Sequence, residues 1–359
     1  MRTACTLIRT FSRRGPLSRF SRHYVLCSIL FLFALACSAQ ESGPVAQRPI
    51  QSATELVKIE TSVLDHDGNF VGGLAQSSFR IFDNGVEQPI AFFEPVEAPA
   101  QVIVMLETSP AVYLISEQHL AAAYALLDGL APDDEVALVT YDAAPHPVLA
   151  FTADKPALPA ALGKTQYTIG MGELNFYDSL STVLDWLAPV TGKKAVVVLT
   201  TGLDSSAPAR WDSLVRKLRG NDVVIFSVEL GGALRAAPPK KAKQKKSASS
   251  TGSASEQALA ESITAAGFAK ADDALRSLAT ITGGRAYFPK SDKEFASIYR
   301  EIAVALRHQY FLGIAPAHDN QFHPLAVEVL GSSSHSDARQ TNQAQYRVFA
   351  RAGYLAPSP

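Results

Sequence analysis

Two long apolar runs in the chain are each followed by a polar turn and then by a helical pattern. Residues 101–106 lead into Glu107, and residues 195–200 lead into Thr201. A continuous apolar run of this length, bounded by turn signals, predicts a strand that is buried on both faces of a parallel sheet. Open α/β sheets bind their ligands in the loops at the carboxyl ends of such strands. The residues after these two strands are therefore the first candidates for a functional site.

Strands and helices alternate on both sides of these two runs. Further strands are predicted at residues 135–141, 147–151, 222–228 and 285–288, and helices at 116–130, 177–187, 208–219, 271–282 and 292–307. Strands separated by helices of this length form βαβ units. The sequence therefore predicts an α/β fold with a doubly wound, mostly parallel sheet over residues 99–315.

The segments that flank this region have a strand pattern instead. Residues 57–63 alternate apolar and polar positions, Asp83-Asn84-Gly85 is a hairpin signal, and two more β-like segments follow at 325–329 and 345–351. We expect residues 55–98 and 316–359 to pair into one small accessory β domain. That pairing would bring the two ends of the folded chain together.

One internal segment has neither pattern. Residues 231–268 contain Pro238-Pro239, a lysine-rich run at 240–246 and a tract of serine, alanine and glycine. Such a composition cannot bury enough apolar area to offset the entropy lost on ordering. We expect a disordered insertion there.

The first 39 residues have the features of a signal peptide. They contain six arginines and no acidic residue, followed by an apolar stretch at 24–36 and small residues before Gln40. Residues 40–54 are then a flexible lead-in. Two variants remain open: a twin-arginine signal at 12–17, and a lipoprotein cleavage box in which Cys37 is lipidated. The leader could also be retained as a membrane anchor.

Composition narrows the possible chemistry once this leader is removed. The chain has three cysteines, all within residues 1–39, so the mature protein has no thiol nucleophile and no disulfide. It keeps 27 basic and 34 acidic residues, a formal charge of −7. A surface of that sign makes nucleic acid a poor partner.

Several motifs resemble those of exported proteins related to the von Willebrand factor A (VWA) domain, of the acidobacterial type. The first stretch comprises Gly73-Leu74, Phe79, Asn84-Gly85 and Gln88-Pro89-Ile90, and the second comprises 306–313 and 351–354. The resemblance covers about residues 56–355. It implies a VWA fold, in which a divalent cation commonly binds at the strand ends through an Asp-x-Ser-x-Ser loop, a threonine, and an aspartate that precedes glycine.

Matched residue by residue, most of that cation site is altered. Glu107 stands at the first aspartate, Ser109 at the first serine, Ala111 at the second serine and Thr201 at the last aspartate, while the threonine position falls near Leu174. Mg²⁺ requires near-octahedral oxygen geometry, so the resemblance implies a degenerate site. We expect no metal and no other cofactor, and any residual cation would use Glu107 and Ser109.

The sequence thus predicts an exported, non-enzymatic VWA-like module that binds a protein or another envelope macromolecule without a metal. Nucleic acid is not an expected partner, and membrane contact is expected only through the leader. The candidate contact surface at the strand ends comprises Glu107, Thr108, Ser109, Thr201 and Asp204.

Three alternative kinds of site stay open. One is a weakened cation-dependent adhesion site that uses Glu107. Another is a hydrolase in which Ser109 is the nucleophile, which requires a histidine or carboxylate within about 3 Å of its hydroxyl. A metal site at His318, Asp319 and His323 is a weaker possibility, because their spacing fits no standard motif and a fourth ligand is missing.

Overall fold

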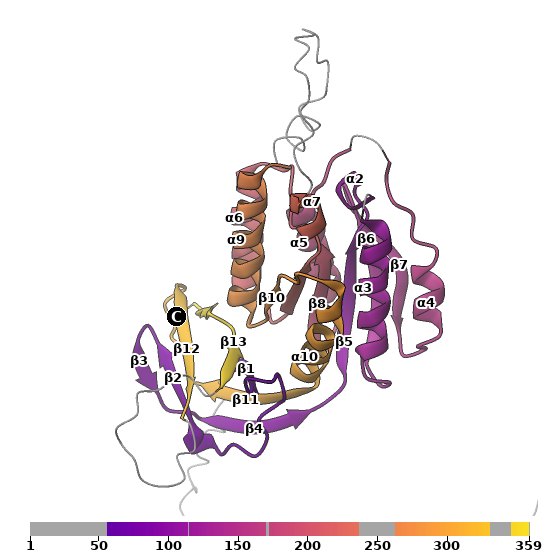
Figure 1. The fold of residues 1–359 in the computed structure, drawn as a ribbon. Coiled ribbons are helices and arrows are strands. Elements are labelled where there is room, and N and C mark those ends of the chain that lie inside the picture. The colour runs from indigo at the N-terminus through magenta and orange to yellow at the C-terminus, as the bar shows by residue number, and fades with distance from the viewer. Residues whose placement is uncertain (1–55, 114, 170–171, 237–262, 331–345, 359) are drawn as a thin grey trace, which may run out of the picture. The chain divides into compact units, whose positions relative to one another are not determined.

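A six-stranded, mostly parallel sheet forms the centre of the computed structural model (Figure 1). The structure describes residues 56–113, 115–169, 172–236, 263–330 and 346–358. The strands are β5 (Ala100–Glu107), β6 (Glu135–Tyr141), β7 (Pro145–Thr152), β8 (Lys193–Thr200), β9 (Val224–Glu229) and β10 (Ala286–Tyr287). Their order is β10-β9-β8-β5-β6-β7, and only β7 runs antiparallel to its neighbour. This is a doubly wound, mostly parallel sheet, as the sequence predicts.

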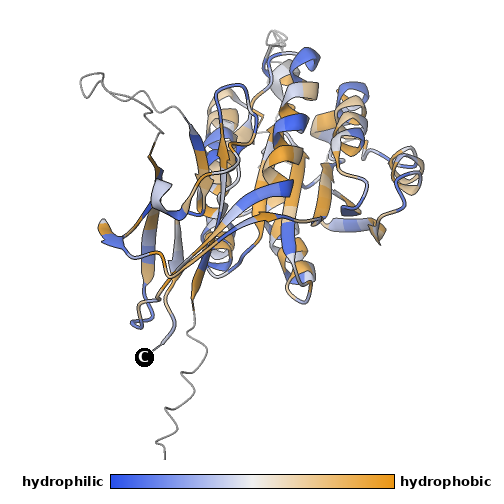
Figure 2. Cartoon of the chain, turned by 90° about the horizontal axis from the view of Figure 1, so that it is seen from below, coloured by the Kyte–Doolittle hydropathy of each residue, from blue (hydrophilic) through white to orange (hydrophobic). Residues whose placement is uncertain are grey.

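Helices cover both faces of the sheet. One face packs against α3 (Ser116–Gly129), α4 (Ala157–Leu162) and α10 (Phe295–Arg307), and the other against α5 (Phe176–Leu187), α6 (Pro208–Arg219) and α9 (Ala265–Thr282). The short helices α2 (Pro110–Tyr113) and α7 (Gly232–Ala236) follow β5 and β9. Residues of high hydropathy are concentrated on the central strands and on the inner sides of the helices (Figure 2).

Alternate residues of each central strand supply the two cores. In β5, Val102, Val104 and Leu106 face α3 and α10, whereas Ile103 and Met105 face α5, α6 and α9. This is the two-residue periodicity of a strand, applied to a sheet that is buried on both sides. Glu107, the last residue of β5, lies two residues beyond Met105 and therefore on the α5, α6 and α9 face.

Strands from both flanks of the described chain pair, as predicted, and they form two small antiparallel sheets that share one hydrophobic core. The first has the order β13-β1-β11-β4 and the second β14-β12-β2-β3. Their strands are β1 (Val57–Leu64), β2 (Phe79–Asp83), β3 (Val86–Gln88), β4 (Phe92–Glu97), β11 (His308–Ile314), β12 (Phe322–Val329), β13 (Arg347–Ala350) and β14 (Gly353–Leu355), with the single-turn helix η1 (Gln76–Ser78) before β2. Because β11 pairs with β1 and β4, the accessory part begins at His308, inside the range 99–315 that was assigned to the α/β domain.

Helix α9 also differs from its prediction. It begins at Ala265, where the Thr264 hydroxyl accepts a 3.0 Å hydrogen bond from the N–H of Gly267. Helix α7 lies inside the same predicted insertion, 231–268, so both ends of that segment are ordered. The rest of the predicted insertion, residues 237–262, lies outside the described residues. Phe268, which is buried in the second core, stabilises the early start of α9.

The predicted leader, 1–39, and the lead-in, 40–54, also lie outside the described residues. Within the residues that are described, no helix combines the length and the apolar character needed to cross a membrane.

Candidate functional site: the carboxyl edge of the central sheet

The carboxyl ends of β5 and β8 meet at the point where the strand order reverses. From β5 the chain continues to β6 on one side, while β8 leads to β9 on the other. Leu106 pairs with Leu199, which places Glu107 beside Thr200 at the edge of the sheet. Open α/β sheets bind ligands at such a switch point, so this edge is the candidate site.

The side chain of Glu107 crosses this edge to the end of β8. Its Oε1 accepts hydrogen bonds from the hydroxyls of Ser109 (2.6 Å) and Thr201 (3.0 Å). Its Oε2 accepts from the backbone N–H of Thr201 (2.6 Å) and the hydroxyl of Thr200 (2.9 Å). The hydroxyl of Tyr141 lies 2.6 Å from that of Thr200 and 3.3 Å from Oε2. Protein donors therefore surround both carboxylate oxygens.

The Glu107 carboxyl group is fully buried. Burial is the largest influence on it and raises its pKa, while the hydrogen bonds from Ser109, Thr201 and Thr200 act in the opposite direction. Burial, with the nearby charge of Glu107 as a second cause, also raises the pKa of the Tyr141 hydroxyl. Across the described ranges, no lysine, arginine or histidine forms an ion pair with Glu107, so neutral donors alone stabilise it.

The residues at this edge do not fit the divalent cation that VWA domains commonly bind. Of the five positions matched to that site, Glu107 alone supplies a carboxylate, and its lone pairs already face protein donors. Ala111 supplies no side-chain oxygen. Asp204 turns away, because Oδ1 accepts from the N–H and hydroxyl of Ser206 and Oδ2 from the N–H of Tyr177 (2.9 Å). Mg²⁺ keeps several waters in most protein sites, and this group has no solvent-exposed face.

Four of the five residues of the predicted contact surface are buried. Glu107, Ser109 and Thr201 have no exposed surface, and Thr108 is 3% exposed. The hydroxyl of Thr108 donates to the carbonyl of Tyr141 (3.1 Å), and its own carbonyl accepts from the N–H of Thr168 (2.8 Å). These side chains stabilise the edge from inside. Asp204 is half-buried and lines a hollow beside the edge.

Leu174, which was matched to the threonine of the cation site, is also buried and has no side-chain oxygen. Thr168, in the same loop, does bring a hydroxyl to the strand ends. Its Oγ1 donates a hydrogen bond to Asp142 (2.7 Å). The loop is held by these bonds to β5 and to the residue after β6.

Ser109 does have a carboxylate within hydrogen-bonding distance, since Glu107 Oε1 lies 2.6 Å from its hydroxyl. The same hydroxyl accepts the N–H of Ala111 (3.2 Å). A nucleophile must also reach its substrate, and neither Ser109 nor Glu107 is exposed. The pair therefore meets the distance requirement for a serine nucleophile but not the requirement for access.

Two hollows flank this buried cluster at the same edge. The first, which we call the Arg235 hollow, has a volume of about 520 Å³ and is lined by Ile115, Glu229, Arg235, Asp272, Arg276 and Phe288, among others. The second, the Asp204 hollow, has a volume of about 360 Å³ and is lined by Tyr177, Asp204, Ser205, Ser206, Thr264 and Lys270, among others. Sequence reasoning missed the first, because Arg235 falls in the segment that was assigned to the insertion.

Arg235 connects two elements at the first hollow. Its guanidinium binds both oxygens of Asp272 on α9, at 2.9 and 2.6 Å, and lies 3.0 Å from Oε1 of Glu229 at the end of β9. The ring of Phe268 lies below it, 4.7 Å from the guanidinium carbon. Burial raises the pKa of Glu229, while the charge of Arg235 lowers it. Arg276 lies beside this pair with half of its side chain exposed.

Solved structures with a similar fold include an aerotolerance-related membrane protein from Bacteroides fragilis, at 15% identity over 57% of this chain and 98% of that chain, with a TM-score of 0.39. A von Willebrand factor type A structure from Catenulispora acidiphila is 12% identical over 78% and 72% of the two chains, with a TM-score of 0.40. No protein-family model matches the chain, and no curated protein matches it. Likenesses at this level concern the fold alone.

The central sheet is VWA-like. Its strand order, its one antiparallel edge strand and the helices on both faces are those expected for that fold class.

Proposed function

We propose that this protein is an exported, non-enzymatic binding module that takes a protein or another envelope macromolecule at the carboxyl edge of its VWA-like sheet, without a bridging cation. The observation that carries the proposal is the set of hydrogen bonds that the Glu107 carboxylate accepts. Both of its oxygens accept hydrogen bonds from Ser109, Thr200 and Thr201, where a cation would need the same lone pairs.

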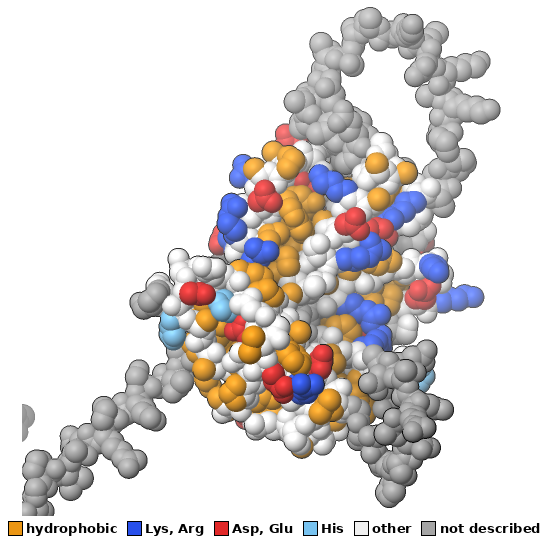
Figure 3. Space-filling model, turned by 90° about the vertical axis from the view of Figure 1, so that its left-hand side faces the viewer, with side chains coloured by type: hydrophobic (Ala, Val, Ile, Leu, Met, Phe, Trp, Pro, Cys, Tyr) orange, Lys and Arg blue, Asp and Glu red, His pale blue; other side chains and the backbone are white. Residues whose placement is uncertain are grey.

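The two hollows are accessible parts of this edge. Arg276 at the Arg235 hollow and Lys270 at the Asp204 hollow are exposed, and apolar residues such as Phe288 lie beside them. Figure 3 shows the left-hand side of Figure 1, where basic and acidic side chains are mixed around a band of hydrophobic ones. A mixed surface of this kind supports a protein partner over nucleic acid, which needs clustered positive charge.

Cation independence is tested first, by calorimetry of the mature protein with Mg²⁺, Mn²⁺ and Ca²⁺. We expect no heat of binding and no shift in melting temperature. Saturable heat that disappears in Glu107→Ala would instead support the weakened adhesion site. Because Glu107→Ala also removes a buried hydrogen-bonding group, Ser109→Ala serves as a milder second variant.

The binding surface is tested by capture from envelope extracts in the presence of EDTA. A specific partner should be retained by the wild type and lost in Lys270→Glu or Arg276→Glu. Arg216→Glu is the matched control, since Arg216 is exposed in the last turn of α6, away from this edge. Equal retention by all three variants would place the binding surface elsewhere.

The absence of catalysis needs its own measurement because of the contact between Ser109 and Glu107. We expect no turnover of simple activated esters above that of Ser109→Ala. Turnover that Ser109→Ala abolishes would revive the hydrolase alternative.

Export rests on the basic and apolar leader, and the mass of the mature protein tests it. Cleavage after Ala39 is expected. An added lipid mass on a chain that begins at Cys37 would show a lipoprotein, and an intact leader would show an anchor.

A further inference from the structure

The imidazole of His323, in β12, lies between two carboxylates from different parts of the accessory sheets. Nδ1 is 2.7 Å from Oδ1 of Asp83, the last residue of β2, and Nε2 is 3.0 Å from Oδ2 of Asp319, in the turn before β12. The side chains of His323 and Asp83 are about nine-tenths buried, and that of Asp319 is half-exposed.

Tyr354 of β14 joins the same group. Its hydroxyl donates to Oδ2 of Asp83 (2.9 Å) and accepts the N–H of Ala317 (3.0 Å), and its ring centre lies 5.3 Å from that of His323. The side-chain amide of Asn84, in the turn between β2 and β3, approaches Nδ1 at 3.0 Å. One imidazole therefore connects the β2–β3 hairpin, the turn before β12 and the strand β14.

The arrangement suits the charged form of the ring. A neutral imidazole donates from one nitrogen only, whereas an imidazolium donates from both. A carboxylate on each side favours the charged ring, because a neutral ring would place a lone pair against a negatively charged oxygen. The Asn84 amide nitrogen, 3.0 Å from Nδ1, is a donor and favours a lone pair at Nδ1 instead, but this neutral contact is weaker than the two charged ones. The charged groups that face the ring are Asp319 from the preceding turn and Asp83 from β2, and both raise the pKa of His323, Asp319 more strongly. Asn84 and Tyr354 are the other polar groups in contact with this group.

We propose that His323 is a pH-sensitive clamp, which holds β14 and the turn before β12 against the β2–β3 hairpin when the ring is charged and loosens them when it is neutral. The raised folded-state pKa fixes the direction of the effect. The stability that the clamp contributes is fully present below the pKa of His323 in the unfolded chain, about 6.5. It is lost as the pH rises through the pKa of His323 in the folded protein. The weaker metal hypothesis for His318, Asp319 and His323 has no support among the described residues, where no group of three or more histidine, cysteine or acidic side chains is placed to hold a metal ion.

NMR titration of the ring protons of His323, in the mature protein, tests the first part. We expect a pKa above the ordinary value, and a fall of about one unit in Asp319→Asn, which removes the stronger of the two charges. Asp319 is half-exposed, so this variant should fold. A ring that titrates at its ordinary value, or does not respond to Asp319→Asn, would overturn the clamp.

Amide hydrogen exchange tests the second part. The N–H of Ala317 bonds to Tyr354, and the N–H of Ala356 bonds to the carbonyl of Gln321 (2.8 Å). Corrected for intrinsic rates, both should lose protection above the measured pKa of the ring, and His323→Gln should abolish that pH dependence. His146→Gln is the matched control, because His146 is exposed and pairs with one aspartate, Asp142. Protection that does not change with pH in the wild type would contradict the proposal.

Discussion

The backbone N–H of Thr201 donates a 2.6 Å hydrogen bond to Oε2 of Glu107, and this bond joins the ends of β8 and β5. Thr201 adds a second contact, because its hydroxyl lies 3.0 Å from each carboxylate oxygen. Glutamate reaches the neighbouring strand end because it is one methylene longer than aspartate. Two of the residues that depart from a cation site thus bind each other.

Replacing Glu107 should therefore lower the stability of the protein and should not affect the binding of a cation. Glu107→Ala leaves a cavity and removes the acceptor from the N–H and hydroxyl of Thr201 and from the hydroxyl of Ser109. We expect a loss of about 3 kcal/mol or more in the free energy of unfolding, measured by chemical denaturation. Glu135→Ala is the control, since Glu135 is exposed at the start of β6. Equal stability of the two variants would show that the Glu107 bonds are not formed.

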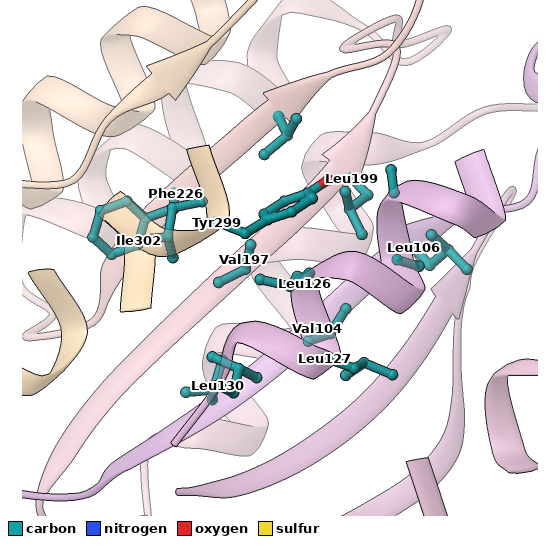
Figure 4. Packing of buried hydrophobic residues seen from close by; sticks show 14 of the residues in the cluster. Val104, Leu106, Leu126, Leu127, Leu130, Val197, Leu199, Phe226, Tyr299 and Ile302 are labelled. Atoms are coloured by element: carbon teal, nitrogen blue, oxygen red, sulfur yellow. The ribbon is translucent and has the colours of Figure 1, made fainter. Parts of the chain in front are cut away.

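Two buried tyrosines provide a matched comparison. The hydroxyl of Tyr141 bonds to Thr200, whereas that of Tyr299 has no hydrogen-bond partner in the part of the chain that the structure describes. In Figure 4 the ring of Tyr299 points from α10 towards Leu199. We expect Tyr141→Phe to cost about 1–2 kcal/mol and Tyr299→Phe to be neutral or stabilising. Thermal denaturation of both variants measures this contrast, and a substantial loss in Tyr299→Phe would indicate a bound water at its hydroxyl.

The strands and the doubly wound, mostly parallel character of the sheet could be predicted because the signal is local. The apolar runs at 101–106 and 195–200 are buried on both faces, and the turn residues that follow them mark the carboxyl edge. The pairing of the two flanks also follows from local alternation. Their division into two sheets does not, because it depends on β11 leaving the central layer to pair with β1 and β4.

The sequence alone could not predict the direction in which the candidate side chains point. A polar residue after a buried strand can face solvent or a neighbouring strand, and the register between β5 and β8 decides which. Glu107 lies beside Thr200 only because Leu106 pairs with Leu199, a contact between residues far apart in the chain. Arg235 was missed for a similar reason, since its partner Asp272 lies 37 positions away.

His119 should make the protein less stable as the pH falls. It is fully buried, with Nε2 3.2 Å from the carbonyl of Leu199 and Nδ1 3.2 Å from the hydroxyl of Tyr167. Burial lowers the pKa of His119 to about 4. Stability is therefore full above the unfolded pKa of about 6.5 and is lost as the pH falls towards the folded value, by on the order of 3 kcal/mol.

His119→Gln should remove this component, because a glutamine can bond to both neighbours without titrating. The measurement is the free energy of unfolding as a function of pH for both proteins. Parallel curves between the two pKa values would mean that His119 is not the group responsible.

Arg235, at the larger of the two hollows, is expected to stabilise the folded protein. Its guanidinium is the cation that pairs with Glu229, whose side chain is 4% exposed, and with Asp272. Arg235→Met keeps most of the stem but leaves both acids without that cation, so we expect a loss of about 2–3 kcal/mol. Adding Glu229→Gln should recover part of the loss, because one unpaired buried charge is then removed, and a double-mutant cycle measures the coupling.

Arg210→Met is the control. The ion pair between Arg210 and Asp178 is exposed, with 3.4 Å between the charged atoms, and should contribute less than about 1 kcal/mol. A loss in Arg235→Met no larger than in Arg210→Met would contradict a stabilising, partly buried ion pair at the edge of the sheet.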